Sequence, residues 1–270
     1  MNKIIITGSS GFIGKNFTNY IAKRKDNIFC LTRKKKLNEN KTSTIFFDLD
    51  DEKITSRFKN LFKSSKVFHF AWGNLPNYQS NYHLKIELKK QINFLKRIID
   101  IGVKKIIVTG TCYEYGMQQG KLYNTDRAKP VVNYAIAKNK LHNWLKKYQK
   151  KKNFNFIWLR LFFVYGPGQS KNSLFQKILL DNKNKKKYFQ MSKGDQMRDF
   201  VDIKDVVKKI YFFDENFENG IFNICSGQPV RLKDHIKYLV KKNKITIKLV
   251  YGKIPYLNYE PKKFWGSNKI

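Results

Sequence analysis

The chain has 270 residues, of which 41% are hydrophobic, and its formal net charge is +35 from 55 basic and 20 acidic residues. That length can bury a large core, and the hydrophobic content excludes a chain that is disordered by composition. Because no run of about 18 apolar residues occurs, we expect no membrane-spanning helix. The first residues enter a strand pattern without a secretory signal, and Cys30, Cys112 and Cys225 lack metal-ligand spacing. We therefore expect a cytoplasmic protein without a metal site.

The positive charge allows two interpretations. It can indicate a nucleic acid or an anionic membrane as partner, or a solvated lysine-rich surface. Only eight of the 55 basic residues are arginines, and the lysines form short runs spread along the chain, at 34–36, 150–152 and 185–187. No ladder of alternating aromatic and basic residues accompanies them. The pattern favours the solvated surface, whose field would still attract a nucleotide-linked substrate.

Apolar strand patterns and amphipathic helix patterns alternate along the chain, which predicts an α/β fold with a mainly parallel sheet. The expected strands are 4–6, 27–32, 44–47, 67–71, 105–109, 156–162, 221–224 and 245–250. The expected helices are 81–101, closed by Gly102, and 134–148, 174–180 and 206–213, with one more after Leu232. After Tyr165 the elements become shorter and more interrupted. This change predicts a second, smaller lobe that does not fold separately.

A glycine-rich turn follows the first strand. Gly8, Gly11 and Gly14 are spaced three apart, and Phe12-Ile13 opens the helix. Gly8 would permit the tight turn, Gly11 would let a phosphate approach the backbone, and Gly14 would let the helix pack closely. Together with Ser10, the loop would present free N–H groups and the positive helix end to a dinucleotide pyrophosphate. A structural turn with incidental glycines is the alternative interpretation.

The end of the second strand indicates which dinucleotide is bound. A carboxylate there would accept hydrogen bonds from the ribose of NAD, whereas an arginine would accommodate the 2′-phosphate of NADP. The chain reads Leu31-Thr32-Arg33 and carries no carboxylate at this point. We expect NADP, with NAD as the alternative, because Arg33 also fits the general basic composition.

Tyr134 and Lys138 are four residues apart and would share one helix face. We expect the lysine ammonium, together with the positive nicotinamide ring of the cofactor, to lower the tyrosine pKa, so that Tyr134 passes a proton to or from a sugar oxygen. Thr111 follows the fifth strand, where open α/β sheets place their ligands, and would hydrogen-bond the same oxygen. A surface pair of tyrosine and lysine is the alternative for the helix motif taken alone.

Taken together and in order, these motifs resemble the extended short-chain dehydrogenase/reductases, which include nucleotide-sugar epimerases, dehydratases and 4-keto reductases. The motifs that carry the resemblance are Thr7-Gly8-x-x-Gly11-x-x-Gly14, Asp48-Leu49, His69-Phe70-Ala71-Trp72, Thr111 to Gly116, Tyr134-x-x-x-Lys138, Arg160 to Gly168 and Arg198-Asp199-Phe200-Val201-Asp202. The resemblance implies a Rossmann-type doubly wound parallel sheet over 1–164, with a return strand near 221–225. It also implies a small, interrupted substrate-binding lobe over 165–270.

The resemblance further implies roles for single residues. Thr111, Tyr134 and Lys138 would be catalytic, and the last two would also contact the cofactor. Asp48 and Leu49 would border the adenine, Phe70, Ala71 and Trp72 would line the cofactor, and Arg198 would bind the diphosphate of a nucleotide sugar. Asn74 and Cys112 would lie near the sugar. For Cys112 both a buried structural thiol and a proton donor in epimerisation stay open.

Departures from the family pattern narrow the expected reaction. Cys112-Tyr113 stands where sugar 4,6-dehydratases have Asp-Glu, which argues against dehydration, and Phe163 takes the place of a diphosphate-binding Asn. Four sequence segments resemble the dTDP-6-deoxy-L-talose 4-dehydrogenase branch of the family: residues 72–78, 110–118, 223–230 and 259–266. We expect an NAD(P)-dependent reductase at C4 of a dTDP-linked 6-deoxy sugar. The alternatives are a nucleotide-sugar 4-epimerase and a non-catalytic dinucleotide-dependent RNA-binding protein. By the same resemblance we expect a homodimer formed through the helices 81–101 and 134–148.

Overall fold

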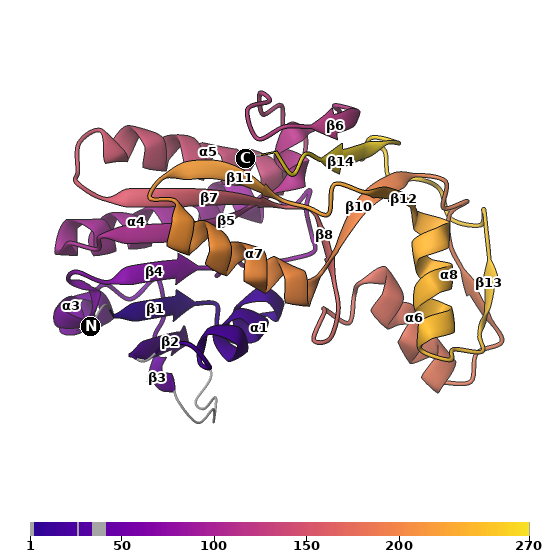
Figure 1. Ribbon diagram of the computed structural model, residues 1–270, viewed down its shortest axis with the longest axis horizontal. Coiled ribbons are helices and arrows are strands. Elements are labelled where there is room, and N and C mark those ends of the chain that lie inside the picture. The colour runs from indigo at the N-terminus through magenta and orange to yellow at the C-terminus, as the bar shows by residue number, and fades with distance from the viewer. Residues whose placement is uncertain (1–2, 26, 34–41, 270) are drawn as a thin grey trace.

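The computed structural model describes residues 3–25, 27–33 and 42–269, and its centre is a seven-stranded sheet with the order β11-β7-β5-β4-β1-β2-β3. Every neighbouring pair in this sheet is parallel. The predicted doubly wound, Rossmann-type fold is confirmed (Figure 1). The strands are β1 (Ile4–Thr7), β2 (Ile28–Thr32), β3 (Thr42–Phe46), β4 (Lys66–His69), β5 (Lys105–Thr111), β7 (Asn155–Leu161) and β11 (Gly220–Ile224).

Helices cover both faces of this sheet because successive strand residues are buried on opposite sides. Ile4 and Ile6 join one hydrophobic core, whereas Ile5 between them joins the other. Helices α1 (Phe12–Ile21) and α7 (Ile203–Asn216) pack on the first core, and α4 and α5 pack on the second. The remaining helical segments of this layer are α2 (Glu52–Arg57), α3 (Lys59–Phe62), the π-helix η1 (His83–Glu87), α4 (Leu88–Ile101), the 3₁₀ turn η2 (Cys112–Tyr115) and α5 (Asn133–Gln149).

The predicted helix 81–101 differs in its first turns. Its N-terminal part is the π-helix η1, and the regular helix α4 begins only at Leu88. It ends as expected at Gly102, which has a φ of 105° and whose N–H bonds back to the helix. A π-helical turn widens the backbone locally and is frequent at functional sites.

A smaller lobe lies to one side of the sheet and is built from short elements (Figure 1). Its own core contains Ile178, Phe189, Met191, Ile236 and Ile247. The predicted strand 245–250 is only Lys248–Val250, since the N–H groups of Thr246 and Ile247 donate to the Asn182 side chain. The elements outside the central sheet and its helices are β6 (Gly120–Leu122), β8 (Phe163–Tyr165), α6 (Leu174–Lys183), β9 (Tyr188–Gln190), β10 (Met197–Asp202), β12 (Pro229–Arg231), α8 (Leu232–Lys242), β13 (Lys248–Val250) and β14 (Phe264–Gly266).

The chain leaves the central sheet after β7 and comes back to it. Strand β11 is the strand expected near 221–225, and it lies parallel to β7 at the sheet edge. Helix α7, which also lies within the range 165–270, packs beside α1 and not in the lobe (Figure 1). The buried carboxylate of Asp199 joins the two parts, because it accepts hydrogen bonds from the backbone N–H groups of Ser226, Gly227 and Gly266.

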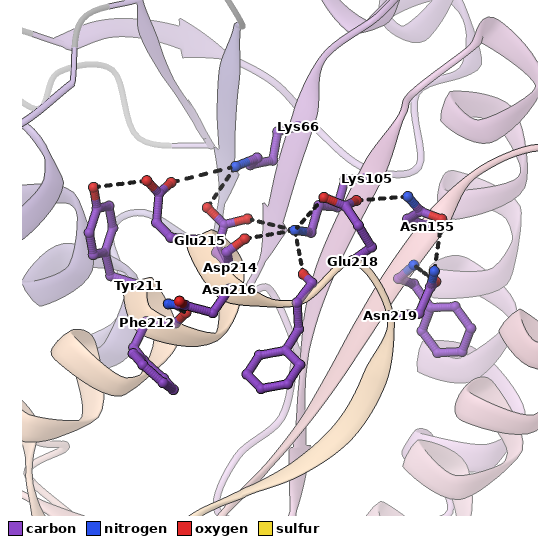
Figure 2. A network of polar contacts seen from close by, with 12 residues as sticks. Lys66, Lys105, Asn155, Tyr211, Phe212, Asp214, Glu215, Asn216, Glu218 and Asn219 are labelled. Atoms are coloured by element: carbon purple, nitrogen blue, oxygen red, sulfur yellow. Dashed lines mark hydrogen bonds and ion pairs between the residues drawn. The ribbon is translucent and has the colours of Figure 1, made fainter. Parts of the chain in front are cut away.

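The edge of the sheet at the N-terminal ends of its strands is held by a polar network, shown in Figure 2. Lys105 begins β5, and its buried ammonium donates to the carbonyl oxygens of Asp214 (2.7 Å) and Phe217 (2.6 Å) at the end of α7. Its Nζ lies 3.5 Å from the Asp214 carboxylate, which also pairs with Lys66 at 2.7 Å. A lysine is therefore buried where the negative end of a helix and a carboxylate neutralise it.

We expect Lys105→Met to lower the free energy of unfolding by about 3 kcal/mol, because it leaves the buried Asp214 and two carbonyl groups without this partner. Urea unfolding of the variant measures the loss. Lys96→Met is the matched control, since Lys96 forms an exposed ion pair with Asp100 on α4. Equal losses in the two variants would contradict the prediction.

Candidate active site

The glycine-rich loop between β1 and α1 is closely packed at two of its three glycines. Gly8 has a φ of 69°, and a Cβ there would lie 2.6 Å from the Ala71 nitrogen. A Cβ on Gly14 would lie 2.2 Å from the Gly8 oxygen. The expected turn and the expected close packing of the helix are both present, and at Gly14 itself the close contact is with the backbone of the loop.

Gly11 is different, because the protein leaves space beside it. A Cβ there would meet only the Gly8 oxygen, at 3.2 Å, and the residue is exposed. Gly11 is also the N-cap of α1, and no side chain caps this helix. The Ser9 hydroxyl, which stands near enough in sequence to do so, instead donates to the Leu31 carbonyl. An exposed, uncapped helix N-terminus beside an open glycine fits the pyrophosphate of a dinucleotide.

A cavity of about 230 Å³ extends from this loop along the ends of β2 and β3. It is lined by nine of the residues expected to bind the cofactor: Gly8, Ser10, Gly11, Arg33, Asp48, Leu49, Phe70, Ala71 and Trp72. Gly14 is buried beneath the loop, and Phe12 and Ile13 face a second cavity. We call the first one the cofactor cavity.

A chain of buried polar residues supports the cofactor cavity, and of these the sequence analysis named only Thr7 and His69. His69 Nδ1 lies 2.8 Å from the Thr7 hydroxyl, and its Nε2 lies 2.5 Å from Gln91 Oε1. The Gln91 amide donates to Glu87 at 2.6 Å, and Glu87 in turn accepts the N–H of Gly73. Burial lowers the pKa of His69 to about 3, so its ring is neutral. The wide π-helical turn brings Glu87 to this position, and periodicity gives no signal for it.

A lysine that the sequence analysis did not single out also lines this cavity. The Lys90 ammonium lies 2.6 Å from an Asp50 oxygen and 3.4 Å from an Asp48 oxygen. Asp48, expected beside the adenine, is therefore held by a cation of α4.

Thr111, Tyr134 and Lys138 are brought together at the ends of β5 and α5. Tyr134 is in the first turn of α5 and Lys138 one turn later, and both are buried. The Lys138 Nζ donates to the Thr109 carbonyl at 2.7 Å and lies 4.0 Å from the centre of the Trp72 ring. The Thr111 side chain acts to lower the pKa of Tyr134, and both residues line a second cavity. Lys138 lines neither this cavity nor the cofactor cavity, and its ammonium lies over the ring of Trp72, which does line the cofactor cavity.

The residues of the chain alone do not lower the tyrosine pKa, which was expected to fall with the nicotinamide ring bound. Burial first, and then the neighbouring Tyr78 and Glu114, raise the pKa of Tyr134 well above its usual value, against the influence of Thr111. Burial also lowers the pKa of Lys138 to about 7, against the charges of Glu114 and Glu87. Tyr134 is therefore held in its protonated, acid form.

A second cavity of about 510 Å³ lies between the ends of β5 and β7 and the lobe. Thr111, Cys112, Tyr134 and Arg198 line it, and most of its other walls are aromatic or aliphatic. A third cavity of about 330 Å³ shares Arg198 and Glu260 with it and continues into the lobe. We call these two the substrate cavities.

Arg198 is buried at the border of the two substrate cavities, and its guanidinium is already engaged. It pairs with Glu260 at 2.8 Å and donates to the carbonyls of Met197 and Lys262. Glu260 also accepts the Tyr113 hydroxyl at 2.5 Å. Sequence reasoning missed this carboxylate, since 62 residues separate it from Arg198 along the chain.

Asn74 and Cys112, the other two residues expected near the substrate, differ in whether they line a cavity. Asn74 is exposed, bonds to Asn77 and lines none of the three cavities described above. Cys112 does line the second cavity, but burial raises the pKa of its thiol far above its usual value. A thiol held so firmly in its neutral form is a poor proton donor, which favours the structural interpretation.

No helix among residues 3–25, 27–33 and 42–269 is long and apolar enough to cross a membrane. In the same part of the chain no group of three or more His, Cys, Asp or Glu side chains is arranged to hold a metal ion.

Comparison with known proteins identifies the family. The chain is 29% identical to dTDP-6-deoxy-L-talose 4-dehydrogenase (NAD(+)) of Aggregatibacter actinomycetemcomitans, over 98% of this chain and 99% of that protein. It is also 29% identical to GDP-6-deoxy-D-talose 4-dehydrogenase of the same organism, over 83% of this chain and 74% of that protein. The fold matches that of MoeE5 in complex with UDP-glucuronic acid and NAD, with a TM-score of 0.85, 20% identity and coverage of 98% and 90% of the two chains. The model of the NAD dependent epimerase/dehydratase family matches residues 4–225, and the chain therefore belongs to that family.

Proposed function

We propose that this chain is an NAD(P)-dependent oxidoreductase that acts at C4 of a dTDP-linked 6-deoxy sugar. The observation that carries the proposal is the position of Thr111 and Tyr134. Both hydroxyl-bearing side chains line the second cavity, and Trp72, which lines the cofactor cavity, packs against the Tyr134 ring with 5.8 Å between ring centres. A sugar carbon beside Tyr134 would thus be next to the dinucleotide.

Three residues of the chain have different roles in the proposed reduction. Tyr134, held in its acid form, gives a proton to the carbonyl oxygen at C4, and Thr111 donates a hydrogen bond to the same oxygen. The buried Lys138 ammonium stabilises the tyrosinate that remains. The nicotinamide dinucleotide supplies or accepts the hydride when bound. Proton transfer of this kind contributes about 10²- to 10⁴-fold to the rate.

The shape of the substrate cavities supports a nucleotide-linked sugar without a 6-hydroxyl group. The sugar has to lie between Tyr134, where the reaction occurs, and Arg198, which we propose as the diphosphate anchor. Tyr113 and Phe163 lie on this path, with 6.0 Å between their rings, and the Arg198 guanidinium is 5.5 Å from the Phe163 ring. Aromatic walls suit a deoxy sugar better than a fully hydroxylated one. The printed name of the dTDP-6-deoxy-L-talose relative supports the same substrate.

A cofactor and substrate panel on the purified protein tests the proposal. We expect loss of reduced-nicotinamide absorbance when a dTDP-4-keto-6-deoxyhexose is added, and the reverse change with the dTDP-6-deoxyhexose and oxidised cofactor. A protein that carries stoichiometric NAD and changes the sugar without net cofactor turnover would instead be a 4-epimerase. Absence of both reactions, combined with salt-dependent RNA binding, would favour the RNA-binding alternative.

We further propose NADP as the preferred cofactor, because Arg33 lines the cofactor cavity at the end of β2. The relative named above uses NAD(+) by its printed name, so NAD is the alternative. We expect Arg33→Ala to lower kcat/KM with NADPH by about 10- to 100-fold, the worth of a charge-assisted hydrogen bond to a phosphate, and to leave kcat/KM with NADH unchanged. Equal effects on the two cofactors would contradict the NADP preference.

The homodimer stays part of this proposal. It would form through α4 and α5, the helices that cover one face of the sheet. Light scattering of the purified protein measures its mass, and a monomer at micromolar concentration would contradict it.

A further inference from the structure

One buried carboxylate beside the active site has no role in the reaction described so far. Glu114 lies in the 3₁₀ turn η2 that follows β5, and its side chain is 0% exposed. It accepts hydrogen bonds from the N–H of Thr111 (2.9 Å), Nε1 of Trp158 (3.1 Å) and Nε of Arg160 (3.0 Å). All three partners are donors, which fits a deprotonated carboxylate.

The surroundings leave Glu114 a single position. A Cβ on Gly110 would lie 2.5 Å from Glu114 Oε1 and 2.2 Å from Trp158 Nε1, so only glycine fits between them. The Arg160 guanidinium lies 4.4 Å from the Tyr115 ring and donates to the Asn124 carbonyl. The ion pair is thus fixed on both sides by strands β5 and β7.

Through this position Glu114 fixes Thr111. Glu114 accepts the Thr111 N–H, while the Thr111 hydroxyl oxygen accepts the Tyr113 N–H at 3.3 Å, so the turn has a reciprocal capping box. With that lone pair used, the hydroxyl proton and the remaining lone pair are left for Tyr134 and the substrate. The orientation of the Thr111 hydroxyl therefore depends on Glu114.

The charge of Glu114 also acts on Lys138. The Lys138 ammonium is buried and makes its hydrogen bond to a neutral carbonyl, that of Thr109. Titratable groups face it from each neighbouring element: Glu114 from η2, Glu87 and His83 from η1, His69 from β4 and Tyr134 from its own helix. Glu114 is the largest of the influences that favour the charged lysine.

We propose that Glu114, held by Arg160, is a positioning residue of the active site. It fixes the turn that presents the Thr111 hydroxyl, and it places a buried negative charge near Lys138, whose ammonium is bonded to Thr109 two residues before Thr111. The inference rests on the proposed function for its kinetic consequence only. Its structural part concerns residues of this chain and is measured without substrate.

The test compares Glu114→Gln with a control on the same strand. Lys105→Met breaks a buried ion pair at the other end of β5, far from the reacting groups, and it controls for lost stability. In Glu114→Gln we expect kcat to fall about 100-fold, since misplacing a reacting group by about 1 Å can cost that much, with KM within about threefold. Lysine ¹⁵N NMR of the cofactor-free protein should show the Lys138 titration about one pH unit lower. The alkaline limb of the kcat profile should move the same way.

A second variant separates position from charge and covers the case in which Glu114→Gln does not fold. Glu114→Asp keeps the charge but retracts the carboxylate by one methylene, so we expect a lower kcat with the Lys138 titration at its wild-type pH. The proposal is overturned if either Glu114 variant only loses stability, as Lys105→Met does, with kcat and the Lys138 titration of wild type. If wild type turns over no sugar but Glu114→Gln still shifts the Lys138 titration, the proposed function fails and the structural inference holds.

Discussion

Tyr134→Phe is expected to lower kcat by about 10²- to 10⁴-fold, because it removes the hydroxyl that gives the proton to the sugar oxygen. The ring itself should stay in place. It packs against Trp72 and Tyr78, with 5.8 and 5.5 Å between ring centres, and neither contact needs the hydroxyl. KM for both substrates and the thermal midpoint are therefore expected to change little. Steady-state kinetics with the dTDP-linked sugar, together with a thermal melt, measure all of these quantities.

Tyr148→Phe is the matched control for this prediction. Tyr148 is on the same helix, and its hydroxyl donates to Asp100 at the surface, outside all three cavities. Its kcat should equal that of wild type. If Tyr134→Phe retained more than about a tenth of the wild-type kcat, the proton donor would have to be another group.

Gly11→Val is expected to weaken dinucleotide binding by at least about 100-fold while the protein stays folded. The protein leaves room at this position, since only the Gly8 oxygen comes near a Cβ, at 3.2 Å. The valine side chain would project from the exposed loop into the space proposed for the pyrophosphate and would hold the phosphates away from the N–H groups of α1. Fluorescence titration with NADPH measures the affinity, and circular dichroism reports whether the fold is kept.

Gly14→Ala is the informative comparison for that variant. Its methyl group would lie 2.2 Å from the Gly8 oxygen, so the helix and the loop must separate. We expect a loss of about 1–3 kcal/mol in the free energy of unfolding, the usual cost of overpacking. The Gly11 substitution should thus weaken dinucleotide binding, whereas the Gly14 substitution should lower stability. Wild-type NADPH affinity in Gly11→Val would refute the role of the loop as a pyrophosphate site.

The elements that the sequence predicted best are those whose signal is local. Ile4 to Ile6 are buried on both faces of the sheet, and a short apolar run records this directly. Gly102 ends α4 because its φ of 105° favours glycine, and a glycine after a periodic segment is a local signal too. Tyr134, Lys138 and Thr111 were found by the same means, since each stands at a fixed offset from a recognisable strand or helix.

The features that the sequence did not predict depend on pairs far apart in the chain. The Arg198 side chain meets Glu260, and Glu114 meets Arg160, only after the strands have assembled. No periodicity marks either carboxylate, because the arginine that pairs with it is far away along the chain. The strands of the lobe were predicted less well from the sequence for a related reason. Its strands are mostly three residues long, as in β8, β9, β12 and β13, which is too short to show a period of two.

The effect of the chain's own residues on the pKa of Tyr134 was not predicted, for another physical reason. A helix wheel places Lys138 on the same face as Tyr134, but it does not show how deeply both are buried. In the folded chain burial first, and then the neighbouring Tyr78 and Glu114, raise the pKa of the tyrosine. To predict the direction of a pKa shift, one therefore has to know how deeply the group is buried, and a single sequence does not show this.

The return of the chain to the sheet edge has a consequence for synthesis on the ribosome. Strand β11 is the last strand of the central sheet to be made, and the N–H groups that hold Asp199 come from residues 226, 227 and 266, later still. The glycine loop and its strand, by contrast, emerge first. A nascent chain can thus acquire its dinucleotide loop early, whereas Arg198 and Asp199 are fixed beside the substrate cavities only after residues 226–266 have been made. Until β11 is made, β7 is an open edge of the sheet, and such an edge favours pairing with other chains.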